Sequence, residues 1–164
     1  MPYALAWPRS EAHDSELERA LGNLRAVHRV SPEILTCGQP EIADFAALRK
    51  AGCDAVLNLL PPGQENSEEE PVVTDLGMDY EVIPVVWNRP LPRDLERFEA
   101  QMDAWQGRPI LVHCAANLRV SSFVYLWRTR RGICTPEVAQ ADLNAVWTPN
   151  PIWAEFIREM APAP

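Results

Sequence analysis

The stretch "GRPILVHCAANLRVSSFVYLWRTRRG", residues 107 to 132, passes from a continuous apolar segment into His113 and Cys114 and then into an amphipathic run. The segment "PILVHC" has no polar alternation, which is typical of a central strand in a parallel sheet. The run that follows ends in a basic turn and Gly132, as helix C-termini do. Cys114 is therefore predicted between the carboxyl end of a central strand and the start of a helix, where open α/β sheets place their ligands.

Extended and helical patterns alternate along the rest of the chain. Further strands are predicted over the stretches "EILTCG", "DAVLNLL" and "YEVIPV". Helices are predicted over "PEIADFAALRKAG", "VVTDLG", "PRDLERFEAQMDAWQG", "TPEVAQADLNAVW" and "NPIWAEFIREM". This alternation predicts the α/β class, with a central, mostly parallel sheet flanked by helices on both faces.

The N-terminal part is expected to add one amphipathic helix to this core. Ser15 followed by Glu18 forms a capping box. The apolar stripe of this helix, which ends near "HRVSP", contains Leu17, Leu21, Leu24 and His28. We expect a single domain over residues 1–164, with a helical extension at 1–30 and a catalytic-type core at 31–164.

Charge and hydropathy exclude several classes of function. The formal net charge is -8 and the pI is about 4.9, so the surface field repels polyanions, and neither nucleic acid nor a membrane is expected as a partner. No apolar run is long enough to span a bilayer, and the N-terminus lacks the pattern of a signal peptide. A cytoplasmic protein is the resulting expectation.

Neither the cysteines nor the glutamates suggest a metal site. The chain has four cysteines, at positions 37, 53, 114 and 134, without the spacing of a zinc cage or a small disulfide framework, so free thiols are expected. The stretch "PPGQENSEEEP" is predicted to be a solvated loop whose four glutamates are surface charge.

The residues around Cys114 favour an anion site. Loop residues 115 to 119 can turn their amide N–H groups inward, and the following helix adds the positive end of its dipole. A cysteine in such a field is favoured as the nucleophilic thiolate. The guanidinium of Arg119 is a planar fork of donors that matches the oxygens of a phosphoryl group. Together these residues predict a phosphoryl-transfer pocket.

The segment "VHCAANLRVS" resembles the His-Cys phosphate-binding signature of the protein tyrosine phosphatase superfamily, in particular its small bacterial dual-specificity-like branch. The stretches "ILTCGQPEIADFAALRKAGCDAVLNLLPPGQE" and "LGMDYEVIPV" resemble that branch too, so the resemblance covers roughly residues 33 to 132. It implies Cys114 as nucleophile, Arg119 as phosphate clamp, and His113 as the residue that orients the loop and favours the thiolate. It implies neither a metal nor an organic cofactor.

Two alignments with the signature remain open, because four residues rather than the usual five separate Cys114 from Arg119. In a full-length loop, Val120 takes the arginine position, Ser121 supplies the usual hydroxyl, and Asn117 replaces a glycine in a left-handed conformation. In a shorter, rhodanese-like loop, Arg119 is the anion ligand and Val120 replaces the hydroxyl. The second alignment is favoured. The phosphate-binding residues implied are Ala115, Ala116, Asn117, Leu118, Arg119, Val120 and Ser121.

The general acid of these phosphatases is an aspartate in the loop before the helix that leads to the Cys strand. Here that loop is "VVWNRPLPRD", with Trp87 and Asn88 where the acid is expected. Asp94 is the nearest carboxyl group and a possible general acid, although its position also suits the start of a helix. Trp87 is a candidate wall for an aromatic phosphoester.

The sequence therefore predicts a cysteine-dependent phosphatase that forms a phosphocysteine intermediate and acts on a phosphorylated small molecule or a phosphoprotein. One alternative is a rhodanese-like sulfurtransferase, motivated by the six-residue span from Cys114 to Arg119. The other is a non-catalytic phosphate-binding or regulatory module, motivated by the missing aspartate. Cys37 could protect Cys114 as a reversible disulfide, but a buried thiol is the preferred interpretation.

Overall fold

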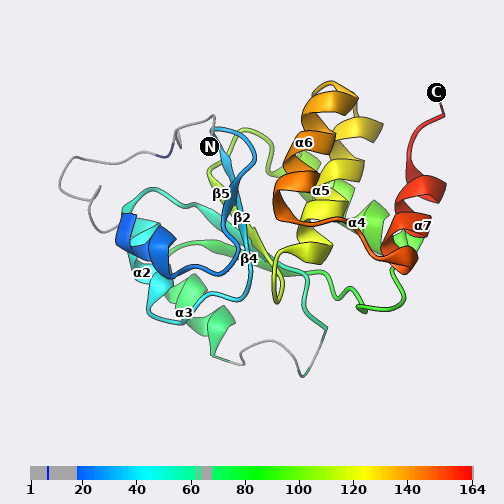
Figure 1. Cartoon of the computed structure of the whole chain (residues 1–164). Helices are drawn as coiled ribbons and strands as arrows, with labels where there is room; N and C mark the ends of the chain where they lie inside the picture. Colours follow the sequence, from blue (N-terminus) through cyan, green and yellow to red (C-terminus); the bar gives the residue numbers. More distant parts are fainter. Residues whose placement is uncertain (1–6, 8–17, 62, 64–67, 164) are drawn as a thin grey trace.

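The computed structural model describes residues 7, 18–61, 63 and 68–163. Its centre is a five-stranded sheet in the order β1-β2-β5-β3-β4 (Figure 1). The strands are β1 (His28–Arg29), β2 (Ile34–Cys37), β3 (Ala55–Asn58), β4 (Asp79–Val82) and β5 (Ile110–His113). β1 pairs with β2 in antiparallel fashion, and all other pairings are parallel.

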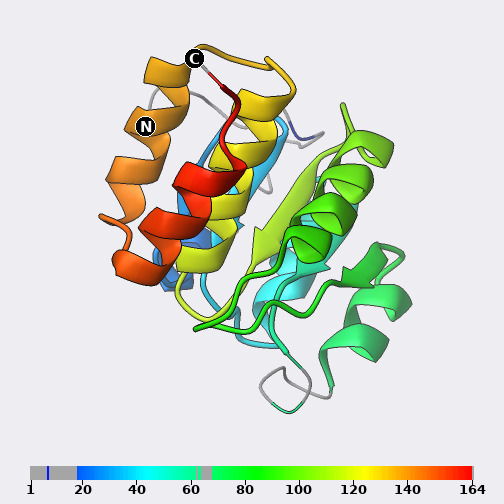
Figure 2. The ribbon, with the colours of Figure 1, turned by 90° about the vertical axis from the view of Figure 1, so that its right-hand side faces the viewer.

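Helices cover both faces of this sheet (Figures 1 and 2). One face carries α2 (Asp44–Lys50) and α3 (Glu69–Asp75), and the chain at 18–23 is also helical on that side. The other face carries α4 (Pro92–Ala104), α5 (Leu118–Arg130), α6 (Pro136–Val146) and α7 (Pro151–Met160). The predicted α/β domain with a mostly parallel sheet and helices on both faces is confirmed.

Strand position in the sheet explains strand composition. β5 lies in the middle, and all four of its residues are buried because helices cover both of its faces. β4 lies at the edge, and its sequence "DYEV" alternates between exposed and half-buried residues. The continuous apolar pattern of "PILVHC" thus located the central strand.

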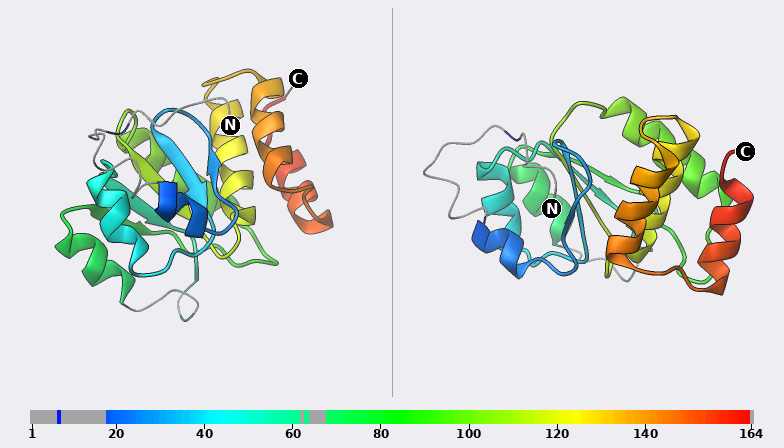
Figure 3. Two further views of the ribbon diagram at one scale, coloured as in Figure 1. Left: turned by 60° about the vertical axis from the view of Figure 1, so that its left-hand side comes forward. Right: turned by 45° about the horizontal axis from the view of Figure 1, so that its top comes forward.

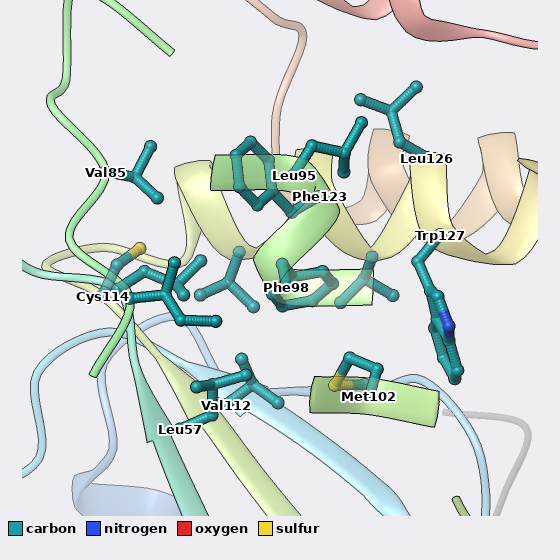
Figure 4. Close-up of a cluster of buried hydrophobic side chains, with 14 of the residues drawn as sticks. Leu57, Val85, Leu95, Phe98, Met102, Val112, Cys114, Phe123, Leu126 and Trp127 are labelled. Carbon is teal, nitrogen blue, oxygen red and sulfur yellow. The ribbon is translucent and has the colours of Figure 1, made fainter. Parts of the chain in front are cut away.

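Side chains alternate between two cores along β5. Val112 and Cys114 belong to the core under α4, α5 and α7, whereas Leu111 belongs to the core under α2 and α3. Figure 4 shows the first core, with Cys114 and Val85 at one end of the cluster and Trp127 at the other. His113 lies between Val112 and Cys114 in the sequence, so it points toward the α3 face.

The N-terminal segment departs from the predicted helix. The helix ends at Asn23, and His28, which was expected on the helical stripe, lies in β1 opposite Thr36 of β2. The strand position gives His28 a backbone partner in the sheet and brings its Nε2 to 2.8 Å from Asp142 of α6. Figure 3 shows this blue segment leaving the α2 side and joining the sheet. The predicted cap at Ser15 lies outside the described residues.

Within the described part of the chain, no helix combines the length and the apolarity needed to cross a membrane.

Candidate functional site

Cys114 follows the last residue of the central strand and lies at the carboxyl edge of the sheet. Its backbone N–H donates to the carbonyl oxygen of Cys37, at the end of β2, over 3.4 Å. The preceding residue, His113, is in register with Cys37 on one side and with Asn58 of β3 on the other. Three parallel strands therefore hold the point at which the Cys114 loop begins.

Asn117 is the residue at which this loop ends, immediately before α5. Its φ is 68°, in the left-handed region that Asn tolerates better than most residues, and α5 begins at the next residue. The Asn117 side chain donates to the Ala26 carbonyl over 2.8 Å and to Thr36 Oγ1 over 3.0 Å instead of capping the helix. The first amides of α5 have no intrahelical acceptor, so this helix end keeps its capacity to bind an anion.

The turn at Gly38 packs against the backbone of the Cys114 loop. A Cβ atom at Gly38 would lie 2.5 Å from the Ala115 carbonyl oxygen, so a side chain at this position would clash with the loop backbone. The next residue, Gln39, donates its backbone N–H to the same oxygen over 3.1 Å. The glycine of the "GQP" stretch is thus explained by close approach of two backbones.

Cys114 and Arg119 line one open pocket of about 150 Å³, together with Trp87, Ala115, Ala116 and Leu118. The Arg119 side chain is only 5% exposed, and its Nη1 donates to the Val85 carbonyl oxygen over 2.9 Å. Its Nε is buried without a partner among the described residues. Arg119 thus lines the same pocket as the Cys114 thiol, and one guanidinium donor has no acceptor among the described residues.

The other residues implied by the signature have different positions. Val120 is fully buried in the core under α4 and α5, and the Ser121 hydroxyl donates to the Leu118 carbonyl oxygen over 3.1 Å. Neither residue is among those that line the pocket. Arg119, not Val120, is the residue whose side chain reaches the pocket with Cys114.

Trp87 forms the wall of the pocket and stacks on the arginine. The Arg119 guanidinium carbon lies 5.7 Å from the centroid of the Trp87 ring, a distance at which a cation–π interaction is significant. The Trp87 carbonyl accepts a hydrogen bond from Trp153 Nε1 over 2.8 Å, and its ring packs against Trp147 and Trp153. Trp87 is 37% exposed, so part of the indole remains free for a ligand.

Asp94 lies in the first turn of α4, after the N-cap residue Leu91. Burial raises the pKa of its carboxyl group, although the Leu91 backbone and two neighbouring arginines oppose this shift. Asp94 is not among the described residues that line the pocket. Its role as general acid stays a prediction.

Glu69 is the residue that the sequence interpretation missed. It was expected to be surface charge in a solvated loop, but it begins α3 and is fully buried. Its Oε2 lies 2.7 Å from His113 Nε2 and also accepts from the Tyr80 hydroxyl over 2.7 Å, and its Oε1 accepts from Gln39 Nε2 over 2.7 Å. The available clue was helical spacing, because Glu69 and Val73 share the buried face of α3.

These contacts keep the Glu69 carboxyl group ionised. Burial alone would raise its pKa, but the hydrogen bond and positive charge of His113, with the hydrogen bonds from Tyr80 and Gln39, outweigh burial and lower the pKa. The same arrangement raises the pKa of Tyr80, first through burial and then through its hydrogen bond to Glu69. A buried, ionised carboxylate in contact with His113 therefore lies next to the start of the Cys114 loop.

Cys37 is a buried thiol on the opposite face of the sheet from Cys114. Cys37 packs in the core under α2 and α3, whereas Cys114 packs in the core under α4 and α5. Burial, followed by the nearby Cys114, raises the pKa of the Cys37 thiol well above its ordinary value. These observations favour the buried-thiol interpretation over a protective disulfide.

Comparison with known proteins found no family model that matches the chain. A beta-lactamase hydrolase-like protein from Agrobacterium fabrum is 31% identical over 103 residues, which are 60% of this chain and 24% of that protein. The chain thus spans about a quarter of the length of the curated relatives it matches.

Solved structures match over more of the chain. A protein from Shewanella putrefaciens described as "putative phosphatase (DUF442)" is 35% identical, with a TM-score of 0.75 over 87% of this chain and 95% of that one. A variant of TpbA from Pseudomonas aeruginosa, solved in complex with pTyr, is 14% identical, with a TM-score of 0.65 over 81% of this chain and 83% of that one. The second likeness concerns the fold alone.

Proposed function

Because the chain belongs to the family of the Shewanella "putative phosphatase (DUF442)", we propose that it hydrolyses phosphomonoesters with Cys114 as the nucleophile. The observation that carries this proposal is the single pocket shared by Cys114 and Arg119 at the uncapped start of α5. A thiolate, loop amides and a guanidinium around one small pocket suit a tetrahedral dianion. The substrate proposed is a phosphorylated small molecule or a phosphoprotein.

The reaction proceeds in two displacements. Cys114 Sγ attacks phosphorus and forms an S–P bond while the bond between phosphorus and the leaving oxygen breaks and its electron pair leaves with that oxygen. Water then attacks the phosphocysteine, the S–P bond breaks, and inorganic phosphate and the thiolate are released. In both steps the loop amides and Arg119 stabilise charge on the three equatorial oxygens.

The leaving group sets a limit on substrates. Among the described residues that line the pocket there is no carboxyl group or imidazole, so a proton donor for the leaving oxygen is not part of that lining. Substrates whose leaving oxygen is stable as an anion, such as aryl phosphates, are therefore preferred over alkyl phosphates. The exposed part of Trp87 offers an aryl group a surface to stack on.

The deciding experiment measures hydrolysis of p-nitrophenyl phosphate by wild type, Cys114→Ser and Arg119→Ala. We expect both substitutions to abolish turnover, whereas Cys134→Ser, a matched thiol substitution beyond the far end of α5, leaves it unchanged. Hydrolysis that survives Cys114→Ser contradicts the proposal. Inorganic phosphate binding without any Cys114-dependent turnover indicates a binding module, and thiocyanate formation from thiosulfate and cyanide indicates a sulfurtransferase.

The Asp94 hypothesis has its own test within this function. A general acid contributes roughly 10²- to 10⁴-fold, mainly with poor leaving groups. Because Asp94 does not line the pocket, we expect Asp94→Asn to lower turnover of phenyl phosphate and of p-nitrophenyl phosphate by the same small factor. A loss of about 100-fold confined to phenyl phosphate would identify Asp94 as the acid.

A further inference from the structure

Two consecutive carbonyl groups of the Cys114 loop are held by hydrogen bonds from outside the pocket. The Cys114 carbonyl oxygen lies 3.4 Å from His113 Nδ1, and the Ala115 carbonyl oxygen accepts from the Gln39 backbone N–H over 3.1 Å. In a trans peptide the carbonyl and the following N–H point in opposite directions. The N–H groups of Ala115 and Ala116 are therefore turned away from His113 and Gln39.

Glu69 connects the two donors that hold these carbonyls. Its Oε2 contacts His113 Nε2 and its Oε1 contacts Gln39 Nε2, each at 2.7 Å. The carboxylate itself is fixed on its third side by the Tyr80 hydroxyl at 2.7 Å, and Asn58 Nδ2 donates to that hydroxyl over 3.1 Å. One fully buried carboxylate thus contacts both residues, His113 and Gln39, that hold the carbonyl groups of Cys114 and Ala115.

The same contacts define the protonation of His113. An ionised carboxylate and a peptide carbonyl can only accept hydrogen bonds. His113 places one ring nitrogen 2.7 Å from Glu69 and the other 3.4 Å from the Cys114 carbonyl oxygen, so a ring that donates to both groups has a proton on each nitrogen. The ring that satisfies both contacts is an imidazolium, whose charge is balanced by Glu69 in a site with no solvent exposure.

We propose that Glu69 is a positioning residue for phosphate binding: it holds His113 as an imidazolium and orients Gln39, and together these turn the Ala115 and Ala116 amides toward the pocket. The inference rests on the proposed function, since it concerns how the same loop receives a phosphoryl group. Glu69 does not itself touch the substrate. It acts through the direction of two backbone donors.

The titratable groups around His113 come from several elements. Glu69 belongs to α3, Tyr80 to β4 and Cys37 to β2, while Cys114 follows β5. Asn58 of β3, in register with His113, has no charge. Of these groups, Glu69 is the one within hydrogen-bond distance of the imidazole that has a negative charge at neutral pH.

The first measurement is the ¹⁵N NMR signature of the His113 ring at pH 8, above the ordinary histidine pKa of about 6.5. The chain has three histidines, so His13→Gln and His28→Gln variants assign the signals. We expect both His113 nitrogens to be protonated in the wild type and only one in Glu69→Gln. A neutral His113 ring in the wild type overturns the proposal.

The second measurement is the concentration of inorganic phosphate that half-protects Cys114 from iodoacetamide, followed by mass spectrometry of the Cys114 peptide. Losing a charge-assisted contact should raise this concentration about tenfold in Glu69→Gln. Tyr80→Phe is the matched control, because it removes one donor to the same carboxylate but neither contact that leads to the loop; a change below about threefold is expected.

The outcomes separate this inference from the proposed function, because protection requires no turnover. Equal shifts in Glu69→Gln and Tyr80→Phe, no shift in Glu69→Gln, or no protection of the wild type would each overturn the inference. Should Glu69→Gln fail to fold, Gln39→Ala at a half-exposed position removes the side-chain contact between Gln39 and Glu69. The half-protecting phosphate concentration is then expected to rise about threefold, and no rise would overturn the inference. Loss of p-nitrophenyl phosphate hydrolysis alone concerns the chemistry, not Glu69.

Discussion

At the scale of single residues, Gly38 links the first parallel strand to the Cys114 loop. Its missing side chain allows the Ala115 carbonyl to approach to 2.5 Å from where a Cβ atom would lie. We expect Gly38→Ala to destabilise the protein by about 1–3 kcal/mol, as overpacking does, and to weaken phosphate protection of Cys114 because the loop must shift. Urea denaturation and the alkylation assay measure the two effects.

Gly22 provides the matched control for this substitution. A Cβ atom at Gly22 meets nothing within 4 Å, and the residue lies in the helical segment at 18–23. Gly22→Ala should therefore keep or raise stability and leave phosphate binding unchanged. If Gly38→Ala behaved like Gly22→Ala, the close approach of the two backbones would have no role in shaping the loop.

At the scale of elements, α7 reaches the pocket through one indole. Asn150 caps the helix by accepting from the Trp153 backbone N–H over 2.9 Å, and Trp153 Nε1 donates to the Trp87 carbonyl. We expect Trp153→Phe to raise KM for p-nitrophenyl phosphate about 3- to 10-fold, since one hydrogen bond that places Trp87 over Arg119 is lost. Trp127 lies near the far end of α5, and Trp127→Phe also loses an indole hydrogen bond, to Asp103 of α4, but should leave KM unchanged. Equal KM values in the two variants would contradict a role for α7 at the pocket.

The elements themselves were largely predictable, and the exceptions have physical causes. A continuous apolar run located β5, an apolar stripe located α4, and the basic turn before Gly132 located the end of α5. The start of α3 at Glu69, three residues before the predicted helix, was missed because acidic residues are usually solvated. The partners that satisfy its buried carboxylate come from distant parts of the chain, among them His113, 44 residues away.

The candidate site was predictable where it depends on local sequence. The spacing of "HCAANLR" placed Cys114 and Arg119 between strand and helix, and both line the pocket. The choice between the two loop alignments depends on the backbone, since the left-handed Asn117 starts α5 early enough for Arg119 to face the pocket and Val120 the core. The partners of His113 come from distant strands and helices, which no local pattern reveals.

At the scale of the whole molecule, the buried Glu69 carboxyl group makes global stability depend on pH. The pKa of Glu69 is lower in the folded protein than its ordinary value of 4.5, so the folded state favours the ionised form. This contribution is fully present above about pH 4.5 and is lost as the pH falls toward the lower folded value. Asp44 and Asp94 act in the opposite direction, because burial raises their pKa values and protonation then favours the folded state.

Glu69→Gln should therefore be less stable than the wild type at neutral pH, and the difference in unfolding free energy should shrink below pH 4.5. Glu155→Gln is the control, because Glu155 also has a lowered pKa, through Arg158, but is exposed. Salt screens an exposed ion pair. In 0.5 M NaCl the Debye length is roughly a few ångströms, so the effect of Glu155→Gln on the unfolding free energy should vanish there, while that of Glu69→Gln persists. Urea denaturation from pH 3 to 7, with and without 0.5 M NaCl, measures these differences. If the difference in unfolding free energy between wild type and Glu69→Gln were independent of pH, the carboxylate charge would not stabilise the fold.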